Sequence, residues 1–304
     1  MMIRNYRSED LKYLLKLTDQ TEMQSDSGDS VSKGQLLEYI DHPGACPTKD
    51  MFVAESDGNL CGFISVFAEP GIGRALLNCL VLPAHRRQGI GTALSDCALK
   101  RAAQSGVNVV QVNISESNAV AKKRLTSMNF QFIRNFFELQ ADIYKKCLPI
   151  VKSAEYVIRP MRQGEEKALT LLQNRCFAGS WGFNPNTINE IIYRLNLEGC
   201  CHQDVQMAFR RDMPVAYCWT RANKTVKKIG AEKKANIHMM GVHPDYRSRG
   251  IGKQTLLACL ADLEGKGCHV VELTVDANNR AGLALYKSLG FKVLETTEWY
   301  EKRV

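Results

Sequence analysis

Hydrophobic and polar positions alternate and then recur at helical spacing along the second half of the chain. Apolar residues alternate with polar ones over 205–210, 215–221 and 236–242, as is typical of half-buried strands. Leucines then recur at helical spacing over 256–263, and the β-branched run 269–275 predicts a further strand. Several strands followed by strand–helix–strand order indicate an α/β (α+β) fold with a mixed sheet.

The same pattern continues at both ends of this half. A short strand is expected over 156–161, followed by amphipathic helices over 165–176 and 187–197. A last helix over 279–289 is expected to stop at Gly290, because glycine is the usual residue just past a helix C-terminus.

The chain also repeats its own sequence. Residues 81–91 align without gaps with residues 242–252, at an offset of 161, and Asn118 and Asn279 keep the same offset. A repeat of this length is a whole domain. The first half is therefore expected to have the same order of elements, ending in a hairpin that reaches about Tyr144.

A chain of 304 residues has room for two domains of roughly 150 residues. The repeat predicts that they span 1–146 and 155–304. Residues 145–154, which include Pro149 and have mixed polarity, are expected to link them.

Composition narrows the possible partners. Forty Lys and Arg against 32 Asp and Glu give a net charge of +8, a mild excess that suits a small anionic ligand, and no nucleic-acid partner is expected. No apolar run approaches the ~20 residues of a membrane span, so the protein is expected to be cytoplasmic and to have no membrane partner. Eleven scattered cysteines indicate reduced thiols. No metal is expected, since the adjacent Cys200 and Cys201 cannot easily span a tetrahedral site with His202 and Asp204.

Each repeat contains a strand that ends in Arg-x-x-Gly-x-Gly and passes directly into a helix. Such a turn collects free backbone N–H groups and the positive end of the helix, which together bind an anion such as phosphate. Glycine lets ligand oxygens approach the amides, and the arginines add attraction. A turn that merely reverses the chain is the alternative, but two copies in register favour the anion site.

Two other phosphate motifs do not fit. A Walker loop would need glycine where Arg247 stands. A dinucleotide fingerprint would need a third glycine or alanine where Leu94 and Thr255 stand.

The glycine turns resemble the first signature of the GNAT family of N-acetyltransferases, Q/R-x-x-G-x-G/A, at 86–91 and 247–252. The run 275–291 is similar to the second signature, an asparagine-led helix that ends in Leu-Tyr-x-x-x-Gly-Phe. The resemblance covers both halves, as in the two-domain group that includes mycothiol synthase. It implies two tandem GNAT domains, each a mixed, mostly antiparallel sheet flanked by helices.

The resemblance implies that an acyl-CoA, usually acetyl-CoA, is the cosubstrate. The strand before each turn would line the pantetheine arm, the turn would hold the pyrophosphate, and an asparagine of the last helix would meet the arm. In the second half these residues are Met240, Gly241, Val242, Arg247, Ser248, Arg249, Gly250, Ile251, Gly252, Lys253 and Asn279. In the first half they are Cys79, Leu80, Val81, Arg86, Arg87, Gln88, Gly89, Ile90, Gly91, Thr92 and Asn118.

Candidate catalytic residues also follow from the resemblance. Tyr286 occupies the position of the family's general acid, which would protonate the departing thiolate; the alternative is a buried aromatic residue with a structural hydrogen bond. Tandem relatives carry a glutamate where Asn236 stands, and an amide cannot take a proton. His238 lies two residues on, on the same strand face, and is a candidate base acting through a water that Asn236 could orient. A core histidine is the competing interpretation.

The first half lacks these groups. At the 161-residue offset, Leu125, Leu77 and Ala75 stand in place of the tyrosine, histidine and asparagine. The N-terminal domain is therefore expected to be non-catalytic while keeping the residues of a CoA site.

The expected reaction is direct attack of a primary amine on acetyl-CoA in a ternary complex, catalysed by the C-terminal domain. The acceptor is a small-molecule or peptide amine, and Trp181 is a candidate for lining its pocket. Fold kinship does not transfer the acceptor's identity. A non-catalytic acyl-CoA-binding or sensing protein is the alternative, and the expected oligomeric state is a monomer or a homodimer.

Overall fold

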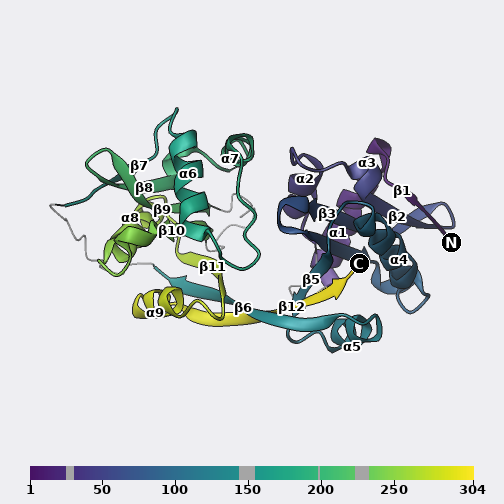
Figure 1. Cartoon of the computed structure of the whole chain (residues 1–304). Coiled ribbons are helices and arrows are strands. Elements are labelled where there is room, and N and C mark those ends of the chain that lie inside the picture. The colour runs from purple at the N-terminus through teal and green to yellow at the C-terminus, as the bar shows by residue number, and fades with distance from the viewer. Residues whose placement is uncertain (25–30, 144–154, 198, 223–232) are drawn as a thin grey trace. The chain divides into compact units, whose positions relative to one another are not determined.

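The chain folds into two compact units, as the computed structural model shows (Figure 1). Unit 1 comprises Met1–Asn135 and Thr297–Val304, and unit 2 comprises Phe136–Thr296. Within the part of the chain that is described, no helix is both long and apolar enough to cross a membrane. The described residues are 1–24, 31–143, 155–197, 199–222 and 233–304.

Unit 1 is a mixed sheet with helices on both faces. Its strands are β1 (Met2–Asn5), β2 (Met51–Ser56), β3 (Asn59–Glu69), β4 (Arg74–Val81), β5 (Val109–Ser115) and the part of β12 (Lys292–Arg303) from Thr297. Its helices are α1 (Leu11–Gln24), α2 (Lys33–Ile40), α3 (Pro47–Asp50), α4 (Ile90–Ala103) and α5 (Ala119–Ser127). The strand order is β1-β2-β3-β4-β5-β12, in which β4 and β5 are parallel and the other neighbours antiparallel. Successive residues of a strand point to opposite faces, so Phe63 joins the core under α1 and α2 while Ile64 joins the core under α4.

Unit 2 repeats this arrangement. Its strands are the part of β6 (Gln131–Asp142) from Phe136, β7 (Val157–Pro160), β8 (Val205–Arg210), β9 (Met213–Ala222), β10 (Lys234–Val242) and β11 (Val270–Asp276). Its helices are α6 (Glu166–Phe177), α7 (Ile188–Leu195), α8 (Ile251–Gly265) and α9 (Arg280–Ser288). The strand order is β6-β11-β10-β9-β8-β7, with β10 and β11 parallel. Tyr217 and Trp219 pack in the core under α6 and α7, and Cys218 packs in the core under α8.

The expected mixed sheets and the duplication agree with the structure. The strand expected over 205–210 is β8, and the helix expected over 279–289 is α9. Gly290 follows α9 with φ +85°, and its counterpart Asn129 follows α5 with φ +61°. An ion pair is duplicated as well, since Arg4 binds Asp10 at 2.7 Å while Arg159 binds Glu165 at 2.9 Å.

The last strand of each half differs from the expectation. The hairpin expected to end near Tyr144 is wrong, because β6 is one continuous strand. Residues 136–142 of β6 pair with β11 in unit 2, and residues 297–303 of β12 pair with β5 in unit 1. Compact unit 1 therefore includes residues 297–304 and compact unit 2 includes residues 136–142, while the domain limits 1–146 and 155–304 stay a prediction. An alternating pattern specifies which face of a strand is buried but not which of two homologous sheet edges it joins. The expected linker, 145–154, lies outside the described residues.

Candidate active site

The glycine turn of unit 2 joins β10 to α8 through a short 3-10 helix, Pro244–Tyr246. Gly250 is the N-cap of α8 with φ +78°, a left-handed conformation that suits glycine, and no side chain caps the helix start. The first backbone bond of the helix runs from Gln254 N–H to the Gly250 carbonyl. The N–H groups before it have no partner within the helix and could therefore bind an anion.

Gly252 allows α8 to approach β10 closely. A Cβ at this position would lie 3.1 Å from Val242 Cγ2 and 3.4 Å from Met240 Cε. The equivalent position in unit 1 is looser, because a Cβ on Gly91 would lie 4.0 Å from Val81 Cγ2. The unit 2 turn thus has little room for a side chain at its second glycine.

The first arginine of each turn braces the backbone. Arg247 Nε donates to the Val242 carbonyl at 3.2 Å, and its Nη2 donates to the Cys176 carbonyl of α6 at 2.6 Å. In unit 1, Arg86 Nε donates to the Val81 carbonyl at 3.0 Å. These arginines hold the turn against the end of the preceding strand, and their expected contact with a pyrophosphate stays a prediction.

Apart from the buried Ile90 and Ile251, the remaining residues of the two turns are exposed. Ser248 has φ +61° and its counterpart Arg87 has φ +63°. The Arg249 guanidinium lies over the Tyr246 ring, 5.3 Å from its centroid. Thr92 accepts a hydrogen bond from Arg124. The turn positions not placed so far are Gln88, Gly89, Ile90, Ile251 and Lys253, which begin or adjoin α4 and α8.

The parallel strands of each unit separate before the glycine turn. Pairing between β10 and β11 ends at Asn236 and Glu272, although β10 continues to Val242. Met240, Gly241 and Val242 pair with β9 along their other edge. Beyond Asn236, the edge of β10 that faces β11 has no strand partner among the described residues, so an extended ligand could hydrogen-bond to it as an added strand. In unit 1, Cys79, Leu80 and Val81 likewise pair with β3 alone, since β4 and β5 pair only as far as Leu76 and Gln111.

A β-bulge distinguishes unit 2 from unit 1. The pairing of β10 with β9 shifts by one residue between Ile237 and Met239, which leaves His238 as the extra residue. The corresponding pairing of β3 with β4 runs without a shift, and Leu77 there is buried. Bulges re-aim side chains and are over-represented beside active sites. Here the bulge leaves His238 exposed to solvent, with its ring 5.2 Å from that of Trp219.

The surroundings of His238 oppose its protonation. Protein atoms around the exposed ring reduce its hydration, and the charges of Arg194 and Arg221 add to this effect, which lowers the pKa of His238 to about 4. The ring is therefore neutral near pH 7 and is a weaker base than an ordinary histidine.

Tyr286 is buried in α9 and packs edge-on against Phe291, with ring centroids 5.7 Å apart. Burial, with a smaller effect of Cys218, raises the pKa of its hydroxyl, so Tyr286 is protonated at neutral pH. Leu285, its neighbour on α9, lies 3.9 Å from the Cβ position of Gly252. A proton donor thus lies in the helix that packs beside the glycine turn.

Three other predicted residues have defined places. Asn279 caps α9, because its Oδ1 accepts from Gly282 N–H at 2.9 Å, and Asn118 caps α5 in the same way. Trp181 lies in the segment between α6 and α7 and packs on Phe136, with ring centroids 5.8 Å apart.

Sequence reasoning missed a polar cluster under α6 and α7. Gln173 is fully buried in α6, where its Oε1 accepts from Asn186 Nδ2 at 3.1 Å. Asn186 Oδ1 in turn accepts from Arg194 Nη1 at 2.8 Å. The sequence did contain a signal, since Gln173 interrupts an otherwise apolar helix face between Leu169 and Cys176.

Glu138 was missed because of the exchanged strand. It lies on β6, comes from the first half of the sequence and pairs with Thr274 of β11. Burial, with the nearby carboxylates of Glu295 and Glu272, raises the pKa of Glu138. Unit 2 thus contains an acidic side chain from the first repeat.

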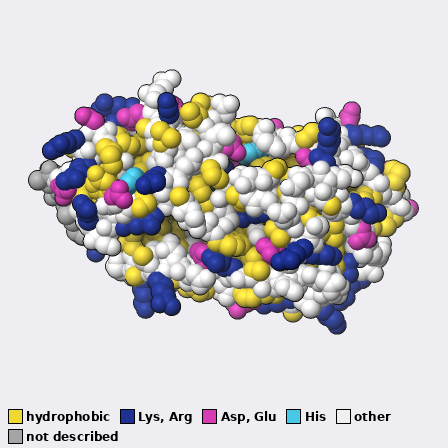
Figure 2. Space-filling model, viewed as in Figure 1, with side chains coloured by type: hydrophobic (Ala, Val, Ile, Leu, Met, Phe, Trp, Pro, Cys, Tyr) yellow, Lys and Arg dark blue, Asp and Glu magenta, His cyan; other side chains and the backbone are white. Residues whose placement is uncertain are grey.

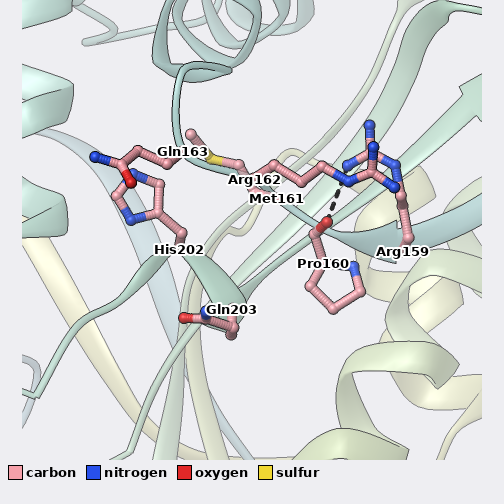
Figure 3. A pocket seen from close by; sticks show the side chains of 7 residues that line it. All are labelled: Arg159, Pro160, Met161, Arg162, Gln163, His202 and Gln203. Carbon is pink, nitrogen blue, oxygen red and sulfur yellow. Dashed lines mark hydrogen bonds between the residues drawn. The ribbon is translucent and has the colours of Figure 1, made fainter.

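A pocket of about 530 Å³ lies in unit 2, apart from the glycine turn (Figure 3). In Figure 3 the Arg159 guanidinium turns to the Pro160 carbonyl, opposite His202 and Gln163. Two of its side chains already have partners, because Arg159 binds Glu165 at 2.9 Å and His202 binds Glu166 at 2.7 Å. The lining residues are Arg159, Pro160, Met161, Arg162, Gln163, His202 and Gln203.

The Cys200–Asp204 segment makes contacts within the protein. Cys201 Sγ donates to Asp204 Oδ2 at 3.1 Å, and Lys266 binds Asp204 at 2.8 Å. The described residues contain no group of three or more His, Cys, Asp or Glu side chains that could hold a metal ion. On the face drawn in Figure 2, Lys and Arg side chains are scattered among hydrophobic and uncharged ones.

Comparison with known proteins adds to this geometry. The model of the acetyltransferase (GNAT) family matches residues 18–130 and 167–291. Mycothiol acetyltransferase of Streptomyces coelicolor is 25% identical over 248 residues, covering 80% of this chain and 76% of the relative.

Two solved structures share the fold over the whole chain. A GCN5-related N-acetyltransferase from Sphaerobacter thermophilus has a TM-score of 0.73 at 19% identity, covering 99% of this chain and 95% of the other. A tandem GNAT protein from the clavulanic acid biosynthesis pathway has a TM-score of 0.75 at 15% identity, covering 99% and 98%. With a glycine turn of the family pattern in each half and a family match over most of its length, the chain belongs to the acetyltransferase (GNAT) family and is a two-domain acyltransferase.

Proposed function

We propose that the protein transfers an acetyl group from acetyl-CoA to a primary amine in a ternary complex, and that unit 2 catalyses the transfer. The family uses acyl-CoA, and the uncapped start of α8 and the free edge of β10 fit a pyrophosphate and an extended arm. One observation carries the assignment to unit 2: it alone combines Tyr286 with the bulge at His238, where unit 1 has Leu125 and an unshifted strand.

Each residue has a distinct task in this proposal. Acetyl-CoA supplies the thioester. The backbone N–H groups at Gly250–Gly252 bind its pyrophosphate, and the β10 edge orients its arm. His238 accepts the proton that leaves the attacking amine, through a water that Asn236 orients. Tyr286 donates its phenolic proton to the sulfur as the C–S bond breaks.

The low pKa of His238 makes a prediction about pH. The ring stays neutral down to about pH 4, so its titration should not shape the pH–rate profile between pH 6 and 8. His238→Gln is expected to lower kcat by about 10²-fold at every pH in this range, with the profile keeping its shape. The pH–rate profile of Glu138→Gln is the comparison, because Glu138 is an acidic residue of unit 2 whose pKa is raised. If the pH–rate profile lost an inflection near pH 6.5 in His238→Gln but not in Glu138→Gln, the low pKa assigned to His238 would be contradicted.

We also propose that unit 1 binds CoA without catalysing transfer. Its turn has the same left-handed glycine, with Gly89 at φ +81°, and its strand edge is also free beyond Leu76. Calorimetric titration with CoA is expected to find two sites in the wild type and one in Gly91→Asp. A single site in both proteins would show that unit 1 does not bind CoA.

The amine class is tested by release of CoA thiol from acetyl-CoA across a panel of primary amines, including amino acids, aminoglycosides and peptides. Mycothiol acetyltransferase relatives make the mycothiol precursor a member of this panel. If none of the amines caused release of CoA thiol while the protein still bound CoA, acetyl transfer would be contradicted and an acyl-CoA-binding protein favoured.

A further inference from the structure

Buried donors without acceptors gather under α6 and α7 of unit 2. Gln173 Nε2, Tyr217 Oη and Trp219 Nε1 are all inaccessible to solvent and have no hydrogen-bond partner among the described residues. A buried donor left unpartnered costs roughly 1–3 kcal/mol, so native proteins seldom keep one without a reason. We call these three residues and Arg194 the donor cluster.

Contacts and charges link the members of the donor cluster. Gln173 and Arg194 both bind Asn186, at 3.1 and 2.8 Å. Tyr217 and Trp219 are two residues apart on β9, so they share one face of the sheet and the core below α6. Burial raises the pKa of the Tyr217 hydroxyl, and the positive charge of Arg194 acts in the opposite direction.

The Arg194 guanidinium has no carboxylate partner among the described residues. Its one hydrogen bond to a described residue goes to Asn186. A partly buried guanidinium beside three N–H or O–H donors is a site that lacks acceptors and negative charge. A carboxylate supplies both, since its two oxygens accept about four hydrogen bonds and match the planar fork of arginine. A neutral ligand would leave the charge uncompensated.

The donor cluster also lies beside the proposed transfer site. Trp219 contacts the ring of His238. The packing of Tyr217 against the β10 backbone is tight, because a Cβ on Gly241 would lie 2.9 Å from Tyr217 Cε1. A ligand held by the donor cluster would therefore lie next to the strand expected to carry the acyl arm.

We propose that the donor cluster binds a carboxylate on the acceptor, so that the acceptors of this protein are amines that also carry a carboxylate, such as amino acids. This inference rests on acetyl transfer by unit 2. It specifies the acceptor class, which the family leaves open.

The first test uses the full chain with saturating acetyl-CoA and three matched sets of acceptors: L-amino acids, their primary amides and the amines that lack the carboxyl group. The wild type is expected to have a kcat/KM at least tenfold higher for amino acids. Arg194→Gln keeps a donor for Asn186 but removes the charge, and should raise the KM for amino acids at least tenfold without changing the KM for acetyl-CoA. Arg175→Gln is the matched control, since Arg175 is an exposed arginine in the last turn of α6. Equal use of amino acids and amides, or a preference that survives Arg194→Gln, would overturn the proposal.

The second test does not depend on turnover. N-acetyl-L-amino acids are added to the protein while the His238 ring signal is followed by NMR, with His238→Gln used to assign it. A bound carboxylate beside Arg194 offsets the positive charge near His238, so the pKa of the ring should rise in the wild type and not in Arg194→Gln. No change in the wild type means that the donors are satisfied by water, and the proposal fails. A rise without acetylation of any amine would instead contradict the proposed transferase function.

Discussion

Tyr286→Phe is expected to lower kcat by about 10²- to 10⁴-fold and to leave the affinity for acetyl-CoA nearly unchanged. Burial keeps the hydroxyl protonated, so that it can donate to the thiolate as the thioester breaks. Phenylalanine preserves the edge-on packing against Phe291, and the loss should therefore come from the missing O–H. Steady-state thiol release gives kcat, and calorimetry gives the dissociation constant for CoA.

Tyr6→Phe is the matched control for this change. Tyr6 is also a buried tyrosine whose hydroxyl pKa is raised by burial, but it lies in the unit 1 core under α1 and α2. The variant is expected to turn over like the wild type. Equal losses of kcat and CoA affinity in Tyr286→Phe would identify Tyr286 as a packing residue instead of the acid.

Gly252→Asp is expected to abolish turnover by removing acyl-CoA binding in unit 2. A Cβ there crowds Val242 and Met240 at 3.1 and 3.4 Å, and the added carboxylate repels a pyrophosphate at the start of α8. Both effects weaken binding of the same ligand, so any residual activity should show a KM for acetyl-CoA that is raised at least 100-fold. Thiol release measures turnover and this KM, and calorimetric titration measures binding of CoA.

The control for Gly252→Asp is Gly265→Asp. Gly265 ends the same helix, and a Cβ there meets no atom within 4 Å. The same charge is thus introduced at the opposite end of α8, and turnover should persist. Normal turnover in Gly252→Asp would place catalysis outside unit 2.

Local patterns were sufficient to predict most elements. The alternation over 205–210 matches β8, and the helical leucines of 256–263 lie in α8, because both patterns are imposed by burial of one face. The glycine turns could also be predicted from the sequence, since a left-handed N-cap such as Gly250 strongly favours glycine. The contact of Arg247 with the Cys176 carbonyl could not be predicted, because it depends on where α6 packs.

The chemistry of His238 shows the same limit. Its side-chain type and strand position could be read from the sequence, and both made it a candidate base. The bulge that exposes it is a mismatch in register between β9 and β10, and the charges that lower its pKa come from Arg194 and Arg221 on other elements. The residues that neighbour His238 in the sequence determine neither this register nor the position of these two charges.

By itself, the sequence determined that this protein is a duplicated mixed α/β chain with a glycine turn in each half, because periodicity and turn chemistry are local properties repeated at a constant offset. Only the tertiary structure decided which sheet each final strand joins, since the two repeats present homologous edges. It thereby put Glu138 of the first repeat into unit 2. It also brought Gln173, Arg194 and Trp219 together under two helices, and long-range packing of this kind leaves no periodic trace in the sequence.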